Sequence, residues 1–439
     1  MAASKQGSTE LMSDVKKPLE IAIVGGGIIG GFAAATLSRL PNSKVSLFEK
    51  AEGPREAGAW IALTEAALLT LSRIANIEEV QEFVYRGKPE PLSRRHWKTG
   101  EVLKYDTSSF PRPENFVQAR THRVPLHNFV LKHVPEGVIK YNHAVVKIDV
   151  DISGGTLHFE NQDPVRADLI VAADGIYSRI RRQFRVNENL EYKGVVAYRY
   201  VFDENLLKDV HGVLDDTSSW MGRDGTSVFL GKVGLQKYGF VALIPEPPNV
   251  ASDLAWNRSA GQRGISHLLH YFQEWDPLIT KIINVLPDIL AFPLERAPWL
   301  HDLTIGDRIV FAGDAAHPTS GVYAVGSSMG FDDIWALYRA LSETSTKSTN
   351  DDSDEETKYN LPLSLFLFNE TRKHFLQRVE RQTFIDGEVK RKYLNVAKDD
   401  ADWQRRLLNT LGGLDWVKEH NVELEYQKVR DEHFLKIYT

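Results

Sequence analysis

The stretch LEIAIVGGGIIGGFAAATLSRLPNSKVSLFEK, residues 19–50, contains the pattern that decides the fold. Residues 19–24 are mostly apolar and run into three consecutive glycines, as a buried parallel strand does before a tight turn. Residues 28–40 place apolar side chains at helical spacing, and Pro41 ends that run. A second short apolar run follows at residues 45–48. We therefore predict a strand–helix–strand unit within an α/β fold.

The glycines of this stretch are spaced as a dinucleotide-binding loop. Gly25-x-Gly27-x-x-Gly30 would permit the tight turn, the close approach of a pyrophosphate and close packing of the helix on the strand. The N-terminus of the helix would face the phosphates. Glu49 ends the second strand, 19 residues after Gly30, where a carboxylate accepts hydrogen bonds from ribose hydroxyls. Because an acid there disfavours a 2′-phosphate, we predict FAD or NAD rather than NADP as the bound dinucleotide.

Composition narrows the class of protein. A chain of 439 residues suggests two to three domains, or one α/β unit with a smaller lobe. The net charge of −6 and the lack of a basic block argue against nucleic acid as a partner. The chain has no cysteine, so redox chemistry would need a bound cofactor. No apolar run is long enough for a membrane span or an export signal, and we expect a cytoplasmic protein.

Further strands are predicted later in the chain. Residues 168–172 and 308–311 are short apolar runs that lead into Ala- and Gly-rich turns and then into helical patterns. Between them, residues 194–203 and 227–245 are rich in Val, Tyr and Phe, which indicates antiparallel strands in a separate sheet. The polar and acidic segment 342–360 is expected to be a solvated loop between two helices. The remainder of the chain is helical in pattern.

Two motifs distinguish FAD from NAD. The segment DGIYSRIR, residues 174–181, follows the strand at 168–172, and GDAAHP, residues 313–318, follows the strand at 308–311. An aspartate at a strand end can accept a ribityl hydroxyl, while the next helix N-terminus presents N–H groups to the flavin. An NAD enzyme needs neither motif. Both match elements of flavin-dependent aromatic hydroxylases and point to Asp174 and Asp314 as ligands of FAD.

With these motifs, residues 19–425 resemble the single-component FAD monooxygenases of the salicylate hydroxylase and para-hydroxybenzoate hydroxylase type, fungal members in particular. Further matching segments are GAWIA at 58–62, HRVPL at 122–126, VVAYR at 195–199, NETR at 369–372 and WVKEHNV at 416–422. The resemblance implies a Rossmann-type FAD-binding domain, an inserted β-sheet substrate domain and a helical C-terminal part. It implies that His122 and His317 belong to loop architecture rather than acting as bases.

The resemblance also implies domain limits and cofactor contacts. After a disordered tail at 1–17, we expect the FAD-binding domain at 18–85, 110–190 and 291–395, the substrate domain at 86–109 and 191–290, and C-terminal helices at 396–439. The residues expected to contact FAD are Gly25, Gly27, Gly30, Glu49, Lys50, Ala62, Arg123, Asp174, Asp314 and Ser327.

In such enzymes NAD(P)H binds transiently and reduces the flavin, and O2 then forms a C4a-hydroperoxyflavin that hydroxylates an aromatic, phenolic or enolic small molecule, in some cases with dearomatisation. No metal is required. A cation beside a phenol oxygen would lower its pKa and favour the reactive phenolate, and Arg199 is the first candidate for that catalytic role. Tyr238 is the second, as a partner of a substrate oxygen. The alternatives are a structural ion pair for Arg199 and simple packing for Tyr238. A monomer or homodimer in secondary-metabolite biosynthesis is expected.

Two departures from the family pattern leave other functions open. After GDAAHP, Gly321 stands where the family has proline and Ala324 where it has its first glycine, and residues 228–231 lack the usual Tyr-Pro pair. These changes fall at the flavin ring and the substrate pocket. They keep open an FAD-holding enzyme with non-redox, cyclase-like chemistry. An NAD-dependent dehydrogenase or an interaction protein would require the aspartate motifs to be coincidental.

Overall fold

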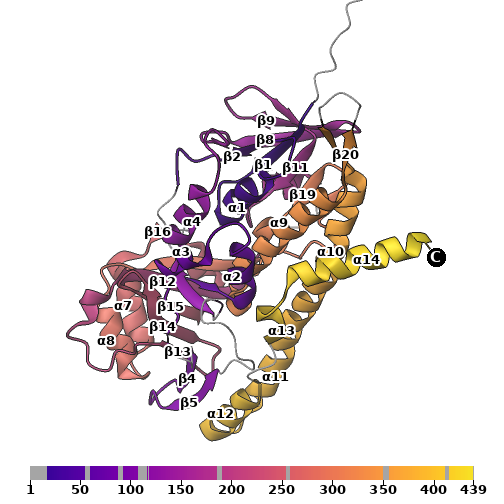
Figure 1. Cartoon of the computed structure of the whole chain (residues 1–439). Helices are drawn as coiled ribbons and strands as arrows, with labels where there is room; N and C mark the ends of the chain where they lie inside the picture. The colour runs from indigo at the N-terminus through magenta and orange to yellow at the C-terminus, as the bar shows by residue number, and fades with distance from the viewer. Residues whose placement is uncertain are drawn as a thin grey trace, which may run out of the picture.

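The computed structural model places two large sheets, three smaller sheets of two or three strands and a group of C-terminal helices in one molecule (Figure 1). It describes residues 17–54, 60–87, 92–106, 116, 118–184, 190–253, 258–349, 355–410 and 415–438. The predicted tail at 1–17 lies almost wholly outside these residues. Within them, no helix has the length and apolarity needed to cross a bilayer.

A six-stranded sheet is built around the first strand of the chain. Its order is β18 (Thr304–Ile305), β19 (Ile309–Phe311), β11 (Leu169–Ala172), β1 (Leu19–Val24), β2 (Ser43–Phe48) and β7 (Ile139–Lys140). All neighbours pair in parallel except β18 with β19. The predicted strand–helix–strand unit and the two later apolar strands are therefore confirmed. Because these strands are parallel, their carboxyl ends lie at the same edge of the sheet. The residues that follow β1, β11 and β19 therefore lie close together at that edge.

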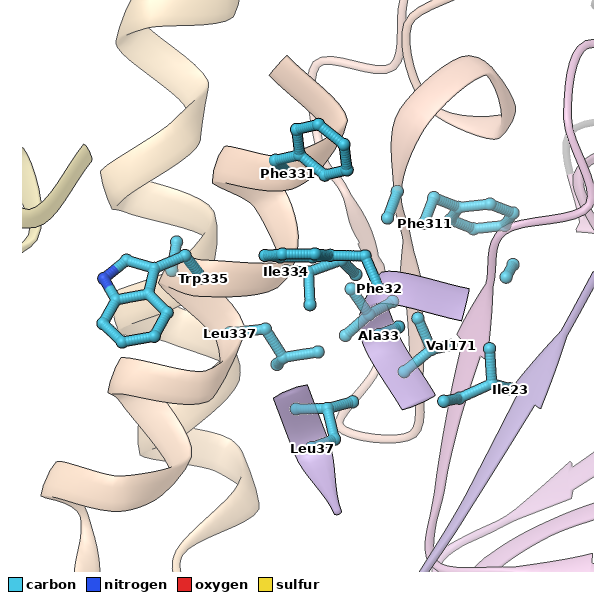
Figure 2. Packing of buried hydrophobic residues seen from close by; sticks show 14 of the residues in the cluster. Ile23, Phe32, Ala33, Leu37, Val171, Phe311, Phe331, Ile334, Trp335 and Leu337 are labelled. Atoms are coloured by element: carbon cyan, nitrogen blue, oxygen red, sulfur yellow. The ribbon is translucent and has the colours of Figure 1, made fainter. Parts of the chain in front are cut away.

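Helix α1 (Ile28–Leu37) packs against this sheet and against α4 (Arg123–Lys132) and α9 (Gly326–Glu343). It ends at Leu37, three residues before the predicted end, and Arg39 and Leu40 continue it only with turn-type bonds to the carbonyls of Thr36 and Leu37. Nearly every residue of α1 is buried, since neighbours cover it on several sides. Figure 2 shows Phe32 of α1 beside Phe331 of α9, with ring centroids 4.7 Å apart.

The second sheet has eight strands, which pair antiparallel except for β13 with β4, and it confirms the antiparallel strands predicted at 194–203 and 227–245. Its order is β16 (Arg258–Ser259), β17 (Leu290–Arg296), β12 (Glu191–Asp203), β15 (Lys237–Pro245), β14 (Ser227–Gly234), β13 (Thr217–Met221), β4 (Leu92–His96) and β5 (Val102–Asp106). Buried side chains of α7 (Gly261–Tyr271) and α8 (Pro277–Val285) join those of the sheet in a core of its own. Strands from both predicted parts of the substrate domain contribute, and β17 continues past residue 290. The domain limits themselves stay a prediction.

Smaller elements connect and extend these sheets. The other strands are β3 (Trp60–Leu63), β6 (Ala119–His122), β8 (Val145–Asp151), β9 (Gly154–Phe159), β10 (Val165–Ala167), β20 (Ser345–Thr349) and β21 (Glu355–Tyr359). The short helices are α2 (Glu65–Leu71), α3 (Ile77–Gln81), α5 (Arg179–Phe184), α6 (Pro248–Ser252), η2 (Glu204–Leu207), η3 (Gly313–Ala315) and η4 (Val322–Ala324).

The prediction of a solvated loop at 342–360 is wrong for its described residues. Strands β20 and β21 pair there in antiparallel register from Ser345 with Tyr359 to Thr349 with Glu355. The Tyr359 hydroxyl donates to the carbonyl of Pro41, and the Asn42 amide donates to the carbonyl of Thr357 at 3.1 Å. The segment is therefore a β-hairpin that is hydrogen-bonded to the loop before β2, although its polar composition is typical of a loop.

The C-terminal part is helical, as predicted. It consists of α10 (Leu361–Phe384), the π-helical turn η5 (Ile385–Val389), α11 (Lys390–Asn395), α12 (Asp400–Asn409), α13 (Asp415–Lys418) and α14 (Val422–Tyr438). Helices α10 and α14 pack on each other and on α9 (Figure 1). Helix α12 contacts the eight-stranded sheet. Oδ2 of Asp400 on α12 lies 2.9 Å from Nε2 of His96 on β4. These helices therefore link both sheets.

We expect Phe32→Ala to lower the free energy of unfolding by about 3–5 kcal/mol, because it leaves a cavity between α1 and α9. Denaturant unfolding of the purified protein measures this. The control is Phe384→Ala, whose side chain is 66% exposed and which should change stability by less than about 0.5 kcal/mol. Equal effects of the two substitutions would contradict the packing described above.

Candidate active site

The glycine loop and Glu49 form the first part of the site. The backbone N–H of Gly26 donates to Oε2 of Glu49 at 2.6 Å, and the N–H of Ala51 donates to Oε1 at 2.7 Å. These bonds hold the carboxylate beside the loop. A Cβ on Gly30 would lie 1.8 Å from the carbonyl oxygen of Gly25, so this close packing requires glycine.

Gly26 and His127 are parts of this site that the sequence reasoning missed. A Cβ on Gly26 would lie 2.8 Å from Cβ of Glu49, so this glycine is also required. Nε2 of the buried His127 donates to the carbonyl of Gly26 at 2.8 Å. The run of three glycines was a visible signal for Gly26, whereas nothing in the sequence distinguished His127.

Arg123 approaches the same site from the end of β6, and Ala62 lies on the paired strand β3. Arg123 is the first residue of α4, and its Nη2 lies 4.0 Å from the position that a Cβ on Gly27 would occupy. Ala62 lies on β3 opposite Arg120 of β6 and is half-buried. Lys50 is exposed directly after Glu49. Gly58 and Ala59, the start of the matched GAWIA segment, lie outside the described residues.

Asp174 follows β11 and offers an acceptor that no described residue uses. Its Oδ2 accepts from the backbone N–H of Arg179 at 2.9 Å, while Oδ1 is buried without a hydrogen-bond partner. Burial raises the pKa of this carboxyl group, although bonds from Ser178 and the Arg179 backbone oppose the shift. A buried acceptor without a partner is costly unless a ligand donates to it. The geometry therefore fits a hydroxyl donor such as that of a ribityl chain.

Asp314 lies at the end of β19, at the edge of the sheet where Asp174 also lies. Its side chain is exposed, and desolvation by the surrounding protein raises the pKa of its carboxyl group. A Cβ on Gly326 would lie 3.9 Å from Oδ1 of Asp314, which places this carboxylate beside the N-terminus of α9. Ser327 is the next residue of that first helical turn and is half-buried.

A buried ionic cluster supports the turn that carries Asp314. Oδ2 of Asp333 accepts from the N–H of Gly313 at 2.9 Å and from Nε2 of His317 at 2.6 Å. Oδ1 of Asp333 accepts from Nε of Arg372 at 2.8 Å. Burial raises the pKa of Asp333, but the charges of His317 and Arg372 outweigh it and hold the pKa below its ordinary value. His317 and Arg372 lie in separate matched segments, and no motif predicted that both would contact Asp333.

The loop after GDAAHP is strained where this chain departs from the family pattern. Ser320, Tyr323 and Ala324 have φ values of 52°, 55° and 55°, in the left-handed region that favours glycine. Ala324 is the residue that replaces the family glycine. The Tyr323 hydroxyl donates to Oδ2 of Asp386 in η5 at 2.5 Å. The loop therefore retains a glycine-like conformation and is bonded to the C-terminal helices.

Arg199 lies on β12, on the face of the eight-stranded sheet that is turned toward β3. It pairs with Val241, two residues from Gly239, where an added Cβ would lie 2.9 Å from Trp60. The Arg199 guanidinium lies 3.7 Å from the ring centroid of Phe292, and its Nε is buried without a hydrogen-bond partner. Burial, and secondarily the charge of Arg123, lower the pKa of Arg199 to about 10. The predicted residues Arg199 and Arg123 are therefore close enough to interact electrostatically.

Tyr238 is not brought together with Arg199. It pairs with Phe202 on β12, so it lies on the opposite face of the sheet, within the core beneath α7 and α8. Its side chain is fully buried, and its hydroxyl lies 3.4 Å from the carbonyl oxygen of Leu214. The predicted catalytic role of Tyr238 thus has no geometric support, because strand alternation directs it away from the face with Arg199. Its position agrees with the alternative that Tyr238 is a tyrosine packed between the sheet and its helices.

Comparisons with known proteins agree with this geometry. The model of the FAD binding domain family matches residues 18–353, and the chain belongs to this family. Salicylate hydroxylase of Pseudomonas putida is 25% identical over 436 residues, covering 95% of this chain and 96% of that protein. The FAD-dependent monooxygenase OpS4 of the fungus Beauveria bassiana is 25% identical, covering 89% and 90%.

Solved structures show the same fold. A salicylate hydroxylase substrate complex matches with a TM-score of 0.74 and 21% identity, covering 94% of this chain and 98% of that one. CtdE in complex with FAD and a substrate matches with a TM-score of 0.76 and 16% identity, covering 96% and 100%. The chain is accordingly an oxidoreductase of the FAD-dependent monooxygenase class, and the predicted fold class and FAD cofactor are confirmed. The NAD-dependent dehydrogenase alternative is set aside.

We expect Asp174→Ala to weaken FAD binding by about tenfold, because the substitution removes the buried acceptor that is free for a flavin hydroxyl. Fluorescence titration of the FAD-stripped protein measures the Kd. Gln183→Ala is the control, since Gln183 lies on the following helix α5 and bonds the backbone of Ile148, and none of the described contacts joins it to Asp174. An unchanged Kd for Asp174→Ala would exclude this carboxylate as a flavin ligand.

We expect Ala324→Gly to raise the free energy of unfolding by about 0.5–1 kcal/mol, because glycine adopts a φ of 55° without the Cβ clash. Thermal unfolding of the FAD-stripped protein measures the change. Ala340→Gly, in the interior of α9, should instead lower stability by about 1 kcal/mol. A loss of stability in Ala324→Gly would show that the loop is unstrained at this residue.

Proposed function

We propose that this enzyme uses NAD(P)H and O2 to hydroxylate a phenolic, aromatic or enolic small molecule, with dearomatisation included, in secondary-metabolite biosynthesis. The observation that carries the proposal is the position of Arg199, a largely buried cation between the eight-stranded sheet and the β3–β6 pair. In the described part of the chain, no carboxylate lies within ion-pair distance of it, and its Nε has no hydrogen-bond partner. A buried cation without such a partner is costly, so an anionic ligand would stabilise it.

A phenolate or enolate is the anion that suits this position. The positive charge of Arg199 lowers the pKa of a bound phenol or enol and so favours its more nucleophilic form. The neighbouring Arg123 strengthens that positive potential. The Phe292 ring, which lies against the guanidinium, offers an apolar surface beside the charge. Arg199 therefore has the chemistry of a residue that binds and activates the substrate.

The rest of the predicted set would hold the cofactor. In this proposal the N-terminus of α1 and the loop with Gly25, Gly27 and Gly30 bind the pyrophosphate, and Glu49 binds the ribose. The side chains proposed along the remainder of the cofactor are Lys50, Ala62, Arg123, Asp174, Asp314 and Ser327. When bound, FAD would carry electrons from NAD(P)H to O2 and so supply the activated oxygen. A cytoplasmic monomer or homodimer stays a prediction.

An anaerobic titration with NADPH and then NADH tests the proposed function. The flavin absorbance is followed with and without a panel of phenolic acids and resorcinols. We expect the visible band to bleach, and to bleach faster with the ring type that the pocket accepts. A flavin that stays oxidised under every condition would contradict the proposal and favour the non-redox, cyclase-like alternative, to which the altered loop at 321–329 points.

We expect Arg199→Gln to leave FAD bound but to raise the KM for the substrate, or lower kcat, by about 10–100-fold, because it removes a charge-assisted hydrogen bond. Steady-state NAD(P)H oxidation with product analysis measures both parameters. Arg199→Lys is the control, since it keeps the charge and should retain more activity at neutral pH. Unchanged turnover in Arg199→Gln would remove this residue from the substrate site.

A further inference from the structure

The guanidinium of Arg372 is fully buried and bonded in three directions. Its Nε donates to Oδ1 of Asp333 at 2.8 Å, and its Nη2 donates to the carbonyl of Met329 at 3.2 Å. Its Nη1 donates to Nε2 of His420 at 3.3 Å. An arginine has only donors, so each of these partners must be an acceptor. The guanidinium is therefore held by α9 on one side and by the C-terminal segment on another.

His420 is built to act as that acceptor. Its ring stacks on Phe375 of α10, with centroids 3.7 Å apart and planes 15° apart, which fixes the direction of Nε2. Burial and the neighbouring charge of Arg372 lower the pKa of His420 to about 3. The imidazole is consequently neutral at physiological pH, and its Nε2 can accept a hydrogen bond.

The contacts of Arg372 lead directly to the turn that carries Asp314. Asp333, the ionic partner of Arg372, accepts the N–H of Gly313 and the Nε2 proton of His317. Gly313 immediately precedes Asp314, the proposed flavin ligand. A displacement of Arg372 would therefore move the Asp333 carboxylate and, with it, the Gly313 N–H. His420 lies 106 residues after Asp314 in the chain, within the matched segment 416–422, and the resemblance does not include it among the residues expected to contact FAD.

We propose that His420 is a positioning residue for the FAD site: its Nε2 orients the guanidinium of Arg372, which orients Asp333 and thereby the Gly313–Asp314 turn. The docking of the segment after α12 thus completes the cofactor site. The inference depends on FAD binding, which the family establishes, and not on the hydroxylation proposed above.

The test compares two substitutions of His420 in the full-length protein. His420→Phe keeps a ring on Phe375 but removes the acceptor, whereas His420→Gln retains an acceptor near the Nε2 position. The protein is stripped of FAD, the Kd for FAD is measured by fluorescence, and the midpoint potential and visible spectrum of the reloaded flavin are recorded. We expect the Kd to rise about tenfold in His420→Phe, with a shifted potential and spectrum, and to stay within about twofold of wild type in His420→Gln.

Glu423→Gln is the matched control. Glu423 lies in the same C-terminal segment and accepts from Nε1 of Trp335 on α9 at 2.8 Å, and none of the described contacts joins it to Arg372. It should leave the Kd unchanged. The proposal is overturned if His420→Phe binds FAD as wild type does, if His420→Gln is as weak as His420→Phe, or if Glu423→Gln is equally weak. Should His420→Phe be insoluble, His420→Met removes the acceptor with a flexible apolar side chain and replaces it in the comparison.

Discussion

The carboxylate of Asp333 is the point on which the arrangement of the site depends. It is fully buried and receives three donors, from Gly313, His317 and Arg372. A buried ion pair adds little net stability, but removing one partner costs about 3–5 kcal/mol because a buried charge is left without compensation. The turn after β19, helix α9 and helix α10 are therefore held in one relative position, and Asp314 is presented at the sheet edge.

The position of Arg199 follows from a second constraint, the alternation of side chains along β12. Successive residues of this strand face either the core under α7 and α8 or the β3–β6 pair. A cation on the core side would have been excluded by its desolvation cost. On the other side it lies against Phe292 of the neighbouring strand β17 and near Arg123 of α4, so these residues together create a positive, partly apolar surface next to the cofactor-binding elements.

Local patterns predicted much of the molecule. The glycine spacing after β1 predicted the strand–helix–strand unit, since turn geometry and helix periodicity depend on neighbouring residues. The aspartates that follow β11 and β19 were recognisable for the same reason. The secondary structure of the polar segment at 342–360 was predicted wrongly, because a polar and acidic pattern does not distinguish a loop from an exposed hairpin. The polar segment at 342–360 contains the hairpin β20–β21, whose anchors to Pro41 and Asn42 lie more than 300 residues away in the chain.

The sequence by itself determined the α/β class and the FAD-binding motifs, because these depend on residues that are close together in the chain. It also identified Arg199 as a candidate substrate-site residue, through a family resemblance carried by short motifs. Only the tertiary structure decided which face of the sheet Tyr238 occupies, because that depends on its register with Phe202. It also decided that Asp333, Arg372 and His420 meet, across separations of 39 and 48 residues. Such contacts follow from the packing of whole helices, which no local periodicity encodes.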